Sequence, residues 1–276
     1  MERKFYMNTE NIKVVMSDVD GTLLTDAGTV SPNTIDAIKK LRKKGILFGI
    51  CSGRDLHNVK ELIPGWGLSG LVDAIVGSGG AEIFDSRTDT YECFYPLSGS
   101  LIWEIIKHFK DMDINFAIPD HGILLVLKED RHIRSLSAKD HIPYKVIDRS
   151  YLLDHEFLKM MIICDPENME QVIRRSRTFS DQRYKSSALQ TAAMLYEYMD
   201  PRISKTFGLE QLMKRNHFTM ENLCTFGDAN NDYDMTKHAG IGVVMANGSK
   251  RTKSAADYIT DDNNHDGISK FVHKFF

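Results

Sequence analysis

Short apolar runs that end abruptly in polar residues constrain the fold of this chain more than any other feature. The clearest runs are Ile12–Ser17, Ile46–Cys51, Leu223–Gly227 and Ile241–Met245. A near-continuous apolar run predicts a strand that is covered on both faces, as in parallel sheets. Between the first two runs, Ser31-Pro32 and then Gly45 predict the start and the end of a helix. Strands that alternate with helices predict an α/β fold with a doubly wound, mostly parallel sheet.

The middle of the chain has a different pattern, which predicts a second α/β domain inserted into the first. A length of 276 residues is enough for about two domains. A segment with helical spacing and two strand-like segments lie in this part, at Ile102–Phe109, Gly122–Lys128 and Phe157–Cys164. Asp200-Pro201 is typical of a linker. We therefore expect a core made of residues 1–85 and 199–276 and an inserted domain at residues 86–198.

Two carboxylates, Asp18 and Asp20, directly follow the first apolar run in the sequence DVDGTL. Because they lie two residues apart at the end of a strand, both can point toward one site, and Gly21 allows the backbone to turn sharply. One carboxylate can then act as a nucleophile while its neighbour transfers a proton. A simple turn is the alternative interpretation, since Asp and Gly are common turn residues.

Polar groups suited to phosphate and magnesium follow two further runs and open a helix. Ser52 and Gly53 follow the second run and offer a hydroxyl and backbone N–H groups to phosphate oxygens. Lys205 opens a helix, where a phosphate would meet both its charge and unpaired N–H groups. The segment Gly227–Asp232 supplies the carboxylate and amide oxygens that suit Mg²⁺. Taken alone, each signal also fits a loop, a solvated lysine or a helix cap.

The order of these signals along the chain indicates a single site. In open α/β sheets, ligands bind beyond the carboxyl ends of the strands, near the topological switch point. If the runs that precede Asp18, Ser52 and Asp228 form neighbouring strands, these side chains and Asp20 converge there.

With these motifs the chain resembles the haloacid dehalogenase-like superfamily, and within it the Cof-type, sugar-phosphatase-like branch. The matching stretches are DVDGTL at Asp18–Leu23, CSGR at Cys51–Arg54, SK at Ser204–Lys205, GDANND at Gly227–Asp232 and DGI at Asp266–Ile268. The family fills the large gap between the second and third stretches with a cap domain, which implies a Rossmann-like catalytic core with an inserted α/β cap. Two positions depart from the branch: Gly79, where Asn is frequent, and Thr206, where Gly frequently follows the lysine.

The resemblance implies a magnesium-dependent phosphatase that forms a transient aspartyl-phosphate. Asp18 would be the nucleophile and a metal ligand. Asp20 would protonate the leaving alkoxide and then activate water, and its backbone carbonyl would be a second ligand. The Asp228 carboxylate would be a third. The phosphoryl oxygens would be held by Ser52, Gly53, Lys205 and Asn231. Asp232 would support Lys205 or a metal-bound water.

The substrate implied by the resemblance is a small phosphorylated metabolite, such as a sugar phosphate, chosen by the cap. Two alternatives use the same residues. A phosphomutase would return the phosphoryl group to a sugar, and a non-hydrolytic switch would keep a long-lived phospho-aspartate on a sheet of the same kind.

Composition narrows the possible partners. A net charge of −3 does not give the basic excess typical of nucleic-acid binding, and no apolar stretch approaches the ~20 residues of a membrane span. The scattered cysteines favour a reducing compartment, with Cys51, Cys164 and Cys224 expected to be buried. Because the N-terminus lacks an apolar signal region, we expect a cytoplasmic protein. The sequence leaves the oligomeric state open.

Overall fold

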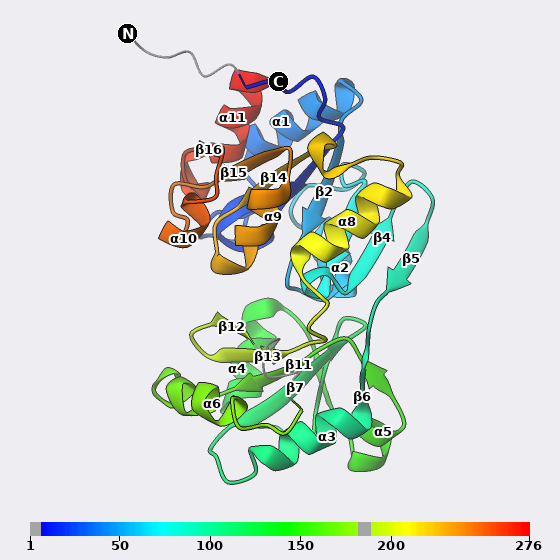
Figure 1. Ribbon diagram of the computed structural model, residues 1–276, viewed down its shortest axis with the longest axis vertical. Helices are drawn as coiled ribbons and strands as arrows, with labels where there is room; N and C mark the ends of the chain where they lie inside the picture. Colours follow the sequence, from blue (N-terminus) through cyan, green and yellow to red (C-terminus); the bar gives the residue numbers. More distant parts are fainter. Residues whose placement is uncertain (1–6, 182–188) are drawn as a thin grey trace. The chain divides into compact units, whose positions relative to one another are not determined.

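The computed structural model describes residues 7–181 and 189–276 of the chain. These residues form two compact units (Figure 1). Unit 1 comprises the chain up to Gly53, Val59–Glu92 and Lys205–Phe276, and unit 2 comprises Arg54–Asn58 and Cys93–Ser204. Residues 1–6, which carry part of the expectation about the N-terminus, lie outside the described residues.

Unit 1 contains an eight-stranded sheet. Its strands are β1 (Val14–Ser17), β2 (Leu47–Cys51), β3 (Ala74–Gly77), β4 (Glu82–Asp85), β5 (Thr90–Cys93), β14 (Leu223–Gly227), β15 (Ile241–Val244) and β16 (Tyr258–Ile259). Their order across the sheet is β16-β15-β14-β1-β2-β3-β4-β5 (Figure 1). The strands from β16 to β3 are parallel, and β4 is antiparallel to β3. The predicted mostly parallel sheet is confirmed, and the four predicted runs form β1, β2, β14 and β15.

Helices cover both faces of this sheet. They are α1 (Pro32–Lys43), α2 (Leu56–Leu62), which begins in unit 2, α8 (Lys205–Arg215), α9 (Tyr233–His238), α10 (Lys250–Lys253) and α11 (Gly267–Phe275). The crossovers from β1 to β2 and from β14 to β15 run in opposite directions from the middle of the sheet. Because such crossovers are right-handed, α1 and α9 lie on opposite faces. α1 packs against α11, and α8 packs against α9 (Figure 1).

The start of α1 shows how local residues determine a helix boundary. Ser31 has extended backbone angles, and its hydroxyl oxygen accepts a hydrogen bond from the backbone N–H of Thr34. Pro32 occupies the first helical position, where its missing N–H is not needed. The N-terminus predicted for this helix is therefore confirmed.

Unit 2 contains a six-stranded sheet with the order β12-β13-β11-β7-β8-β9 and a two-stranded sheet formed by β10 and β6. The strands are β6 (Leu97–Ser98), β7 (Asn115–Asp120), β8 (Ile123–Val126), β9 (Tyr144–Val146), β10 (Glu156–Phe157), β11 (Met160–Ile163), β12 (Leu189–Ala192) and β13 (Leu195–Tyr198). The helices are α3 (Gly99–His108), α4 (Arg131–Asp140), α5 (Arg149–Leu153) and α6 (Met169–Ser176).

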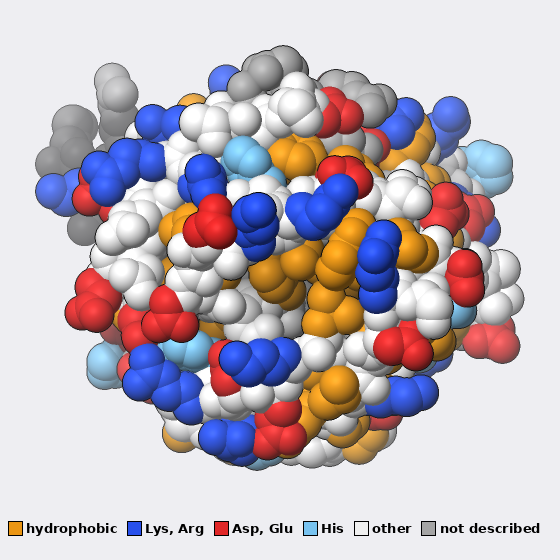
Figure 2. Space-filling model, turned by 90° about the horizontal axis from the view of Figure 1, so that it is seen from below, with side chains coloured by type: hydrophobic (Ala, Val, Ile, Leu, Met, Phe, Trp, Pro, Cys, Tyr) orange, Lys and Arg blue, Asp and Glu red, His pale blue; other side chains and the backbone are white. Residues whose placement is uncertain are grey.

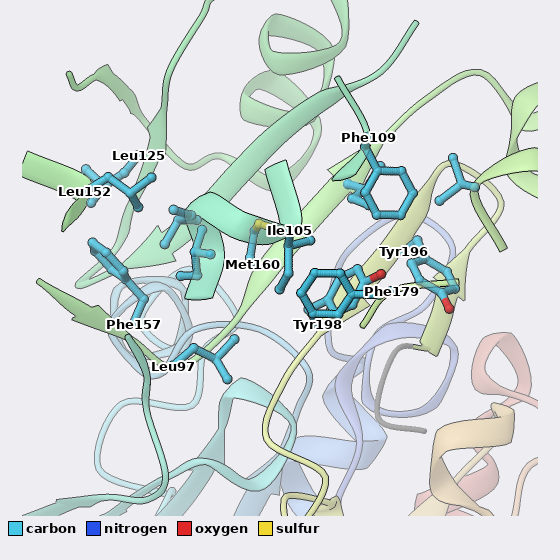
Figure 3. Packing of buried hydrophobic residues seen from close by; sticks show 14 of the residues in the cluster. Leu97, Ile105, Phe109, Leu125, Leu152, Phe157, Met160, Phe179, Tyr196 and Tyr198 are labelled. Atoms are coloured by element: carbon cyan, nitrogen blue, oxygen red, sulfur yellow. The ribbon is translucent and has the colours of Figure 1, made fainter. Parts of the chain in front are cut away.

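Two hydrophobic clusters pack on the two faces of the six-stranded sheet. Side chains alternate along a strand, and in β11 Met160 and Ile162 join one cluster while Met161 and Ile163 join the other. The larger cluster packs against α3, which contributes Ile105 (Figure 3). Unit 2 therefore has a core of its own.

The single strand predicted at Phe157–Cys164 is wrong in one respect, because the structure divides it. β10 pairs with β6, whereas β11 pairs with β7 and β13. Lys159 lies between the two strands and forms a buried ion pair with Glu197 of β13, with a Nζ–Oε1 distance of 3.1 Å. The apolar run changes sheets at this lysine, and apolar composition alone does not reveal a change of partner.

The three cysteines that were expected to be buried are buried, and the surface carries charges of both signs (Figure 2). Figure 2 shows Lys and Arg side chains interspersed with Asp and Glu side chains on the face that it draws. Cys51, Cys164 and Cys224 are buried free thiols, and Cys93 is an exposed one. Among the described helices, none has the length and apolar character needed to cross a bilayer.

Candidate active site

The strand order brings three predicted polar segments to one edge of the sheet in unit 1. β14, β1 and β2 are neighbours and run parallel. Asp228, Asp18 and Ser52 directly follow these strands, so all three emerge at the carboxyl edge. The backbone N–H of Asp18 donates to the carbonyl of Phe226, at 2.9 Å, which extends the strand pairing up to this carboxylate.

The segment after β1 forms a short irregular helix at Val19–Leu23. Gly21 interrupts it with a φ of 77°, a left-handed conformation that favours glycine. A Cβ atom at this position would lie 2.7 Å from Oδ2 of Asp228. Glycine is therefore required both for the turn and for the close approach of the two loops.

Lys205 at the start of α8 links two carboxylates. Its Nζ donates to Oδ1 of Asp18 and, at 2.6 Å, to Oδ1 of Asp232. The Lys205 side chain is 3% exposed. The other oxygen of Asp232 accepts the backbone N–H groups of Asp228 and Ala229, each at 2.9 Å. Asp232 thus holds both the lysine and the loop that carries Asp228.

Thr22 is part of the DVDGTL motif, but sequence reasoning assigned no role to its side chain. Its hydroxyl donates to Oδ1 of Asp228, at 2.7 Å. This bond joins the loop after β1 to the loop after β14 and orients the Asp228 carboxylate. The partner is 206 positions away along the chain, so only the paired strands reveal it.

Burial determines the charge balance of the site. Desolvation raises the pKa of Asp18 to about 8, although Lys205 opposes the shift. It raises the pKa of Asp228 to about 6, although the hydrogen bond from Thr22 opposes it. Burial alone would lower the pKa of Lys205, but Asp18 and Asp232 outweigh it and raise that pKa above its ordinary value. Three carboxylates thus share one ammonium group, and the site favours further positive charge.

The donor set fits a hard divalent cation. One carboxylate oxygen from each of Asp18, Asp228 and Asp232 lies within 4.8 Å of the others. Mg²⁺ prefers one or two carboxylates together with water and phosphate oxygens. Both oxygens of Asp232 are engaged, one by Lys205 and the other by two backbone N–H groups, so Asp18 and Asp228 are the carboxylates of this set that could hold such an ion.

The other predicted site residues occupy the same loops. Ser52 is buried, its N–H donates to the carbonyl of Val76 at 2.8 Å, and its carbonyl accepts the N–H of Gly79 at 3.0 Å. A Cβ atom at Gly53 would meet nothing within 4 Å, so the space beside it is open. The side chains of Asp20 and Asn231 are exposed.

The departure at Gly79 has a conformational explanation. Gly79 has φ 66° and ψ 17°, which is the left-handed region that Gly and Asn adopt most readily. The Asn that is frequent in the branch and the Gly of this chain therefore suit the same turn. Thr206, the other departure, is buried in the first turn of α8.

Comparisons with known proteins agree over most of the chain. A family model described as haloacid dehalogenase-like hydrolase matches residues 15–272. A 5-amino-6-(5-phospho-D-ribitylamino)uracil phosphatase of Bacillus subtilis is 26% identical over 267 residues, which cover 95% of this chain and 95% of the relative.

Solved structures share the fold. A haloacid dehalogenase-like hydrolase from Bacteroides thetaiotaomicron has a TM-score of 0.86 at 21% identity and covers 96% of this chain and 100% of that chain. A sugar phosphatase of subclass IIB of the haloacid dehalogenase superfamily has a TM-score of 0.78 at 21% identity, with coverage of 95% and 98%.

Proposed function

Because the chain belongs to the haloacid dehalogenase-like hydrolase family, we propose that it is a magnesium-dependent phosphatase that hydrolyses small phosphate monoesters through an aspartyl-phosphate on Asp18. Membership makes the chain a hydrolase, and a relative that it matches along nearly its whole length is named a phosphatase. The observation that carries the proposal is the contact of buried Lys205 with Asp18, beside Asp228 at the carboxyl edge of the sheet.

The first half-reaction moves the phosphoryl group to the protein. A carboxylate oxygen of Asp18 attacks phosphorus, the ester P–O bond breaks, and the carboxyl group of Asp20 gives its proton to the leaving alkoxide oxygen. Phosphoryl transfer requires mainly positioning and neutralisation of charge on the phosphoryl oxygens. These oxygens are held by the groups at the same edge of the sheet, namely Ser52, Gly53, Lys205 and Asn231.

The second half-reaction regenerates the enzyme. Asp20, now a carboxylate, takes a proton from water, whose oxygen attacks phosphorus and breaks the bond to Asp18, so that inorganic phosphate leaves. Asp232 keeps Lys205 in place throughout. Asp18, Asp228 and the backbone carbonyl of Asp20 would hold Mg²⁺, whose positive charge would offset the repulsion between a carboxylate and a phosphate dianion.

Unit 2 is proposed as the cap that chooses the substrate. We propose residues 86–198, most of which belong to unit 2, as the cap, and residues 1–85 with 199–276 as the core. The substrate is proposed to be a sugar phosphate or a related phosphorylated metabolite. The subclass IIB sugar phosphatase and the ribitylaminouracil phosphatase both fit this class by name.

The mixed surface charge (Figure 2) and net charge of −3 support a small-molecule partner rather than nucleic acid. A cytoplasmic location is proposed from the free cysteines.

The proposal is tested by phosphate release from a panel of sugar, nucleotide and cofactor phosphates, with and without Mg²⁺. We expect release that a chelator abolishes and Mg²⁺ restores. Because ligands must lose their protons to bind a metal, Mg²⁺ is expected to bind more tightly as pH rises through the pKa values of Asp228, about 6, and Asp18, about 8.

The same two carboxyl groups link Mg²⁺ binding to the stability of the folded protein, which gives a test that does not depend on turnover. Their pKa values exceed the ordinary 3.8, so the metal-free protein loses stability as pH rises from about 4 to 8. The increase in Tm caused by Mg²⁺ should therefore be larger at pH 8 than at pH 5.5. Release that persists in chelator, or a metal effect that is largest at low pH, would contradict the proposed site.

Gly21→Ala should damage the site beyond its cost in stability. The new methyl group would lie 2.7 Å from Asp228 Oδ2, in a backbone conformation that disfavours alanine. Gly28→Ala is the matched control, because Gly28 has a φ of 74° but nothing within 4 Å of the new Cβ. Both variants should lose about 1 to 2 kcal/mol of stability. Only Gly21→Ala should also lower kcat/KM, by roughly tenfold or more, and equal kcat/KM in the two variants would refute this assignment.

A further inference from the structure

Two asparagine side chains donate hydrogen bonds to the backbone of the loop that follows β1. Asn247 Nδ2 donates to the carbonyl oxygen of Gly21, at 2.8 Å, and Asn263 Nδ2 donates to that of Leu24, at 2.9 Å. Asn263 also donates to Oδ1 of Asp26, at 3.0 Å. The two asparagines are themselves joined, because the N–H of Asn263 donates to Oδ1 of Asn247, at 3.4 Å. We call Asn247 and Asn263 the amide clamp.

The amide clamp acts on the part of the loop that determines the geometry of the site. Gly21 lies between Asp20 and Thr22, and the Thr22 hydroxyl orients the Asp228 carboxylate. A bond to the Gly21 carbonyl fixes the plane of the Gly21–Thr22 peptide, and with it the start of the Thr22 side chain. Neither asparagine belongs to the motifs that follow β1, β2 or β14, and their loops follow β15 and β16.

We propose that Asn247 and Asn263 are positioning residues that set the affinity of the site for Mg²⁺, by holding the turn at Asp20–Thr22 against Asp228. The inference rests on the proposed function, because it needs the metal to bind at Asp18, Asp228 and the Asp20 carbonyl. A coordination shell needs its ligands held to within a fraction of an ångström by the surrounding hydrogen bonds.

A purely structural role is the alternative, and the exposure of Asn247 separates the two. Asn247 is exposed, whereas Asn263 is buried. An exposed hydrogen bond contributes little to stability, because water replaces the lost partner. Loss of the Asn247 amide should therefore leave Tm nearly unchanged while it weakens metal binding.

The test measures the Kd for Mg²⁺ by calorimetry on the whole chain without an ester, for the wild type, Asn247→Ala and Asn247→Asp. Both variants lack the Nδ2 donor but differ in charge. We expect about a tenfold weaker Kd in both, at the low end of the range for loss of a hydrogen bond that positions metal ligands. At saturating Mg²⁺ and ester, kcat should return close to the wild-type value, which separates ligand positioning from loss of a reacting group.

Asn222→Ala is the matched control. Asn222 Nδ2 donates to the backbone carbonyl of Asn11, at 2.9 Å, in a hydrogen bond that is likewise exposed but lies before β14, at the opposite edge of the sheet. Its Kd should equal that of the wild type. An unchanged Kd in Asn247→Ala, or weakening only in Asn247→Asp, would overturn the amide clamp while leaving the phosphatase intact. A wild-type protein that binds no Mg²⁺ would instead overturn the proposed function.

Discussion

Replacement of Asp18 by asparagine is expected to reduce Mg²⁺-dependent phosphate release on the order of 10⁴-fold, the scale for loss of a reacting group in an enzyme. An amide is not a nucleophile at phosphorus, whereas the amide oxygen of the new side chain could still accept the hydrogen bond that Lys205 now gives to Asp18. The arrangement of the site should therefore be preserved in the variant, while nucleophilic attack on phosphorus is lost. The measurement is release from the best ester of the panel at saturating Mg²⁺.

Stability provides the control for this variant. Burial raises the pKa of Asp18 to about 8, so the folded protein disfavours a charge at this position. A neutral amide should leave the Tm of the metal-free protein unchanged or higher, and it should reduce the increase in Tm caused by Mg²⁺. Release at the wild-type rate in a folded Asp18→Asn variant would remove Asp18 from the nucleophile's role.

Replacement of Lys205 by methionine should have the second largest effect. The Lys205 Nζ contacts both Asp18 and Asp232 in a buried site. Loss of the ammonium should lower kcat/KM by roughly 10²- to 10³-fold, the scale for one electrostatic donor. It should also cost about 3 to 5 kcal/mol of stability at neutral pH, because buried carboxylates are left without their partner.

Arg42→Met separates the two effects of the lysine variant. Arg42 makes a bidentate ion pair with the buried carboxylate of Asp73, at 2.9 and 3.2 Å, before β3 at the opposite edge of the same sheet. This variant also leaves a buried carboxylate unpaired, so it should lose stability and keep kcat/KM. If both variants lost kcat/KM equally, the loss in Lys205→Met would reflect folding alone.

Much of the architecture could be predicted because local composition determines it. β14 lies where the run Leu223–Gly227 placed it, and all its residues are buried, as expected for a strand that is covered on both faces. The three loops that carry Asp18, Ser52 and Asp228 could be expected at one edge once their strands were assumed to be adjacent, and the strand order meets that condition.

The remainder depends on partners that are distant in sequence. The hydrogen bonds of Thr22 to Asp228 and of Asn247 to Gly21 join residues more than 200 positions apart. No periodicity or propensity marks such a pair. The same holds for Lys159, whose ion pair with Glu197 lies where one apolar run divides into two strands. Local sequence patterns predict helices and strands, whereas the role of a side chain depends on its contacts with residues that are distant in sequence.

The central position of β1 determines when the protein can become active during synthesis. β1 pairs with β2 on one side and with β14 on the other, and β14 is made about 200 residues later. At ordinary rates of translation this interval is roughly 10 to 40 s. For most of this interval the emerging chain carries Asp18 and Asp20 without Lys205, and Asp228 is made only after β14. If Lys205 and Asp228 have the proposed roles, a nascent chain that ends before Asp228 is expected to be inactive.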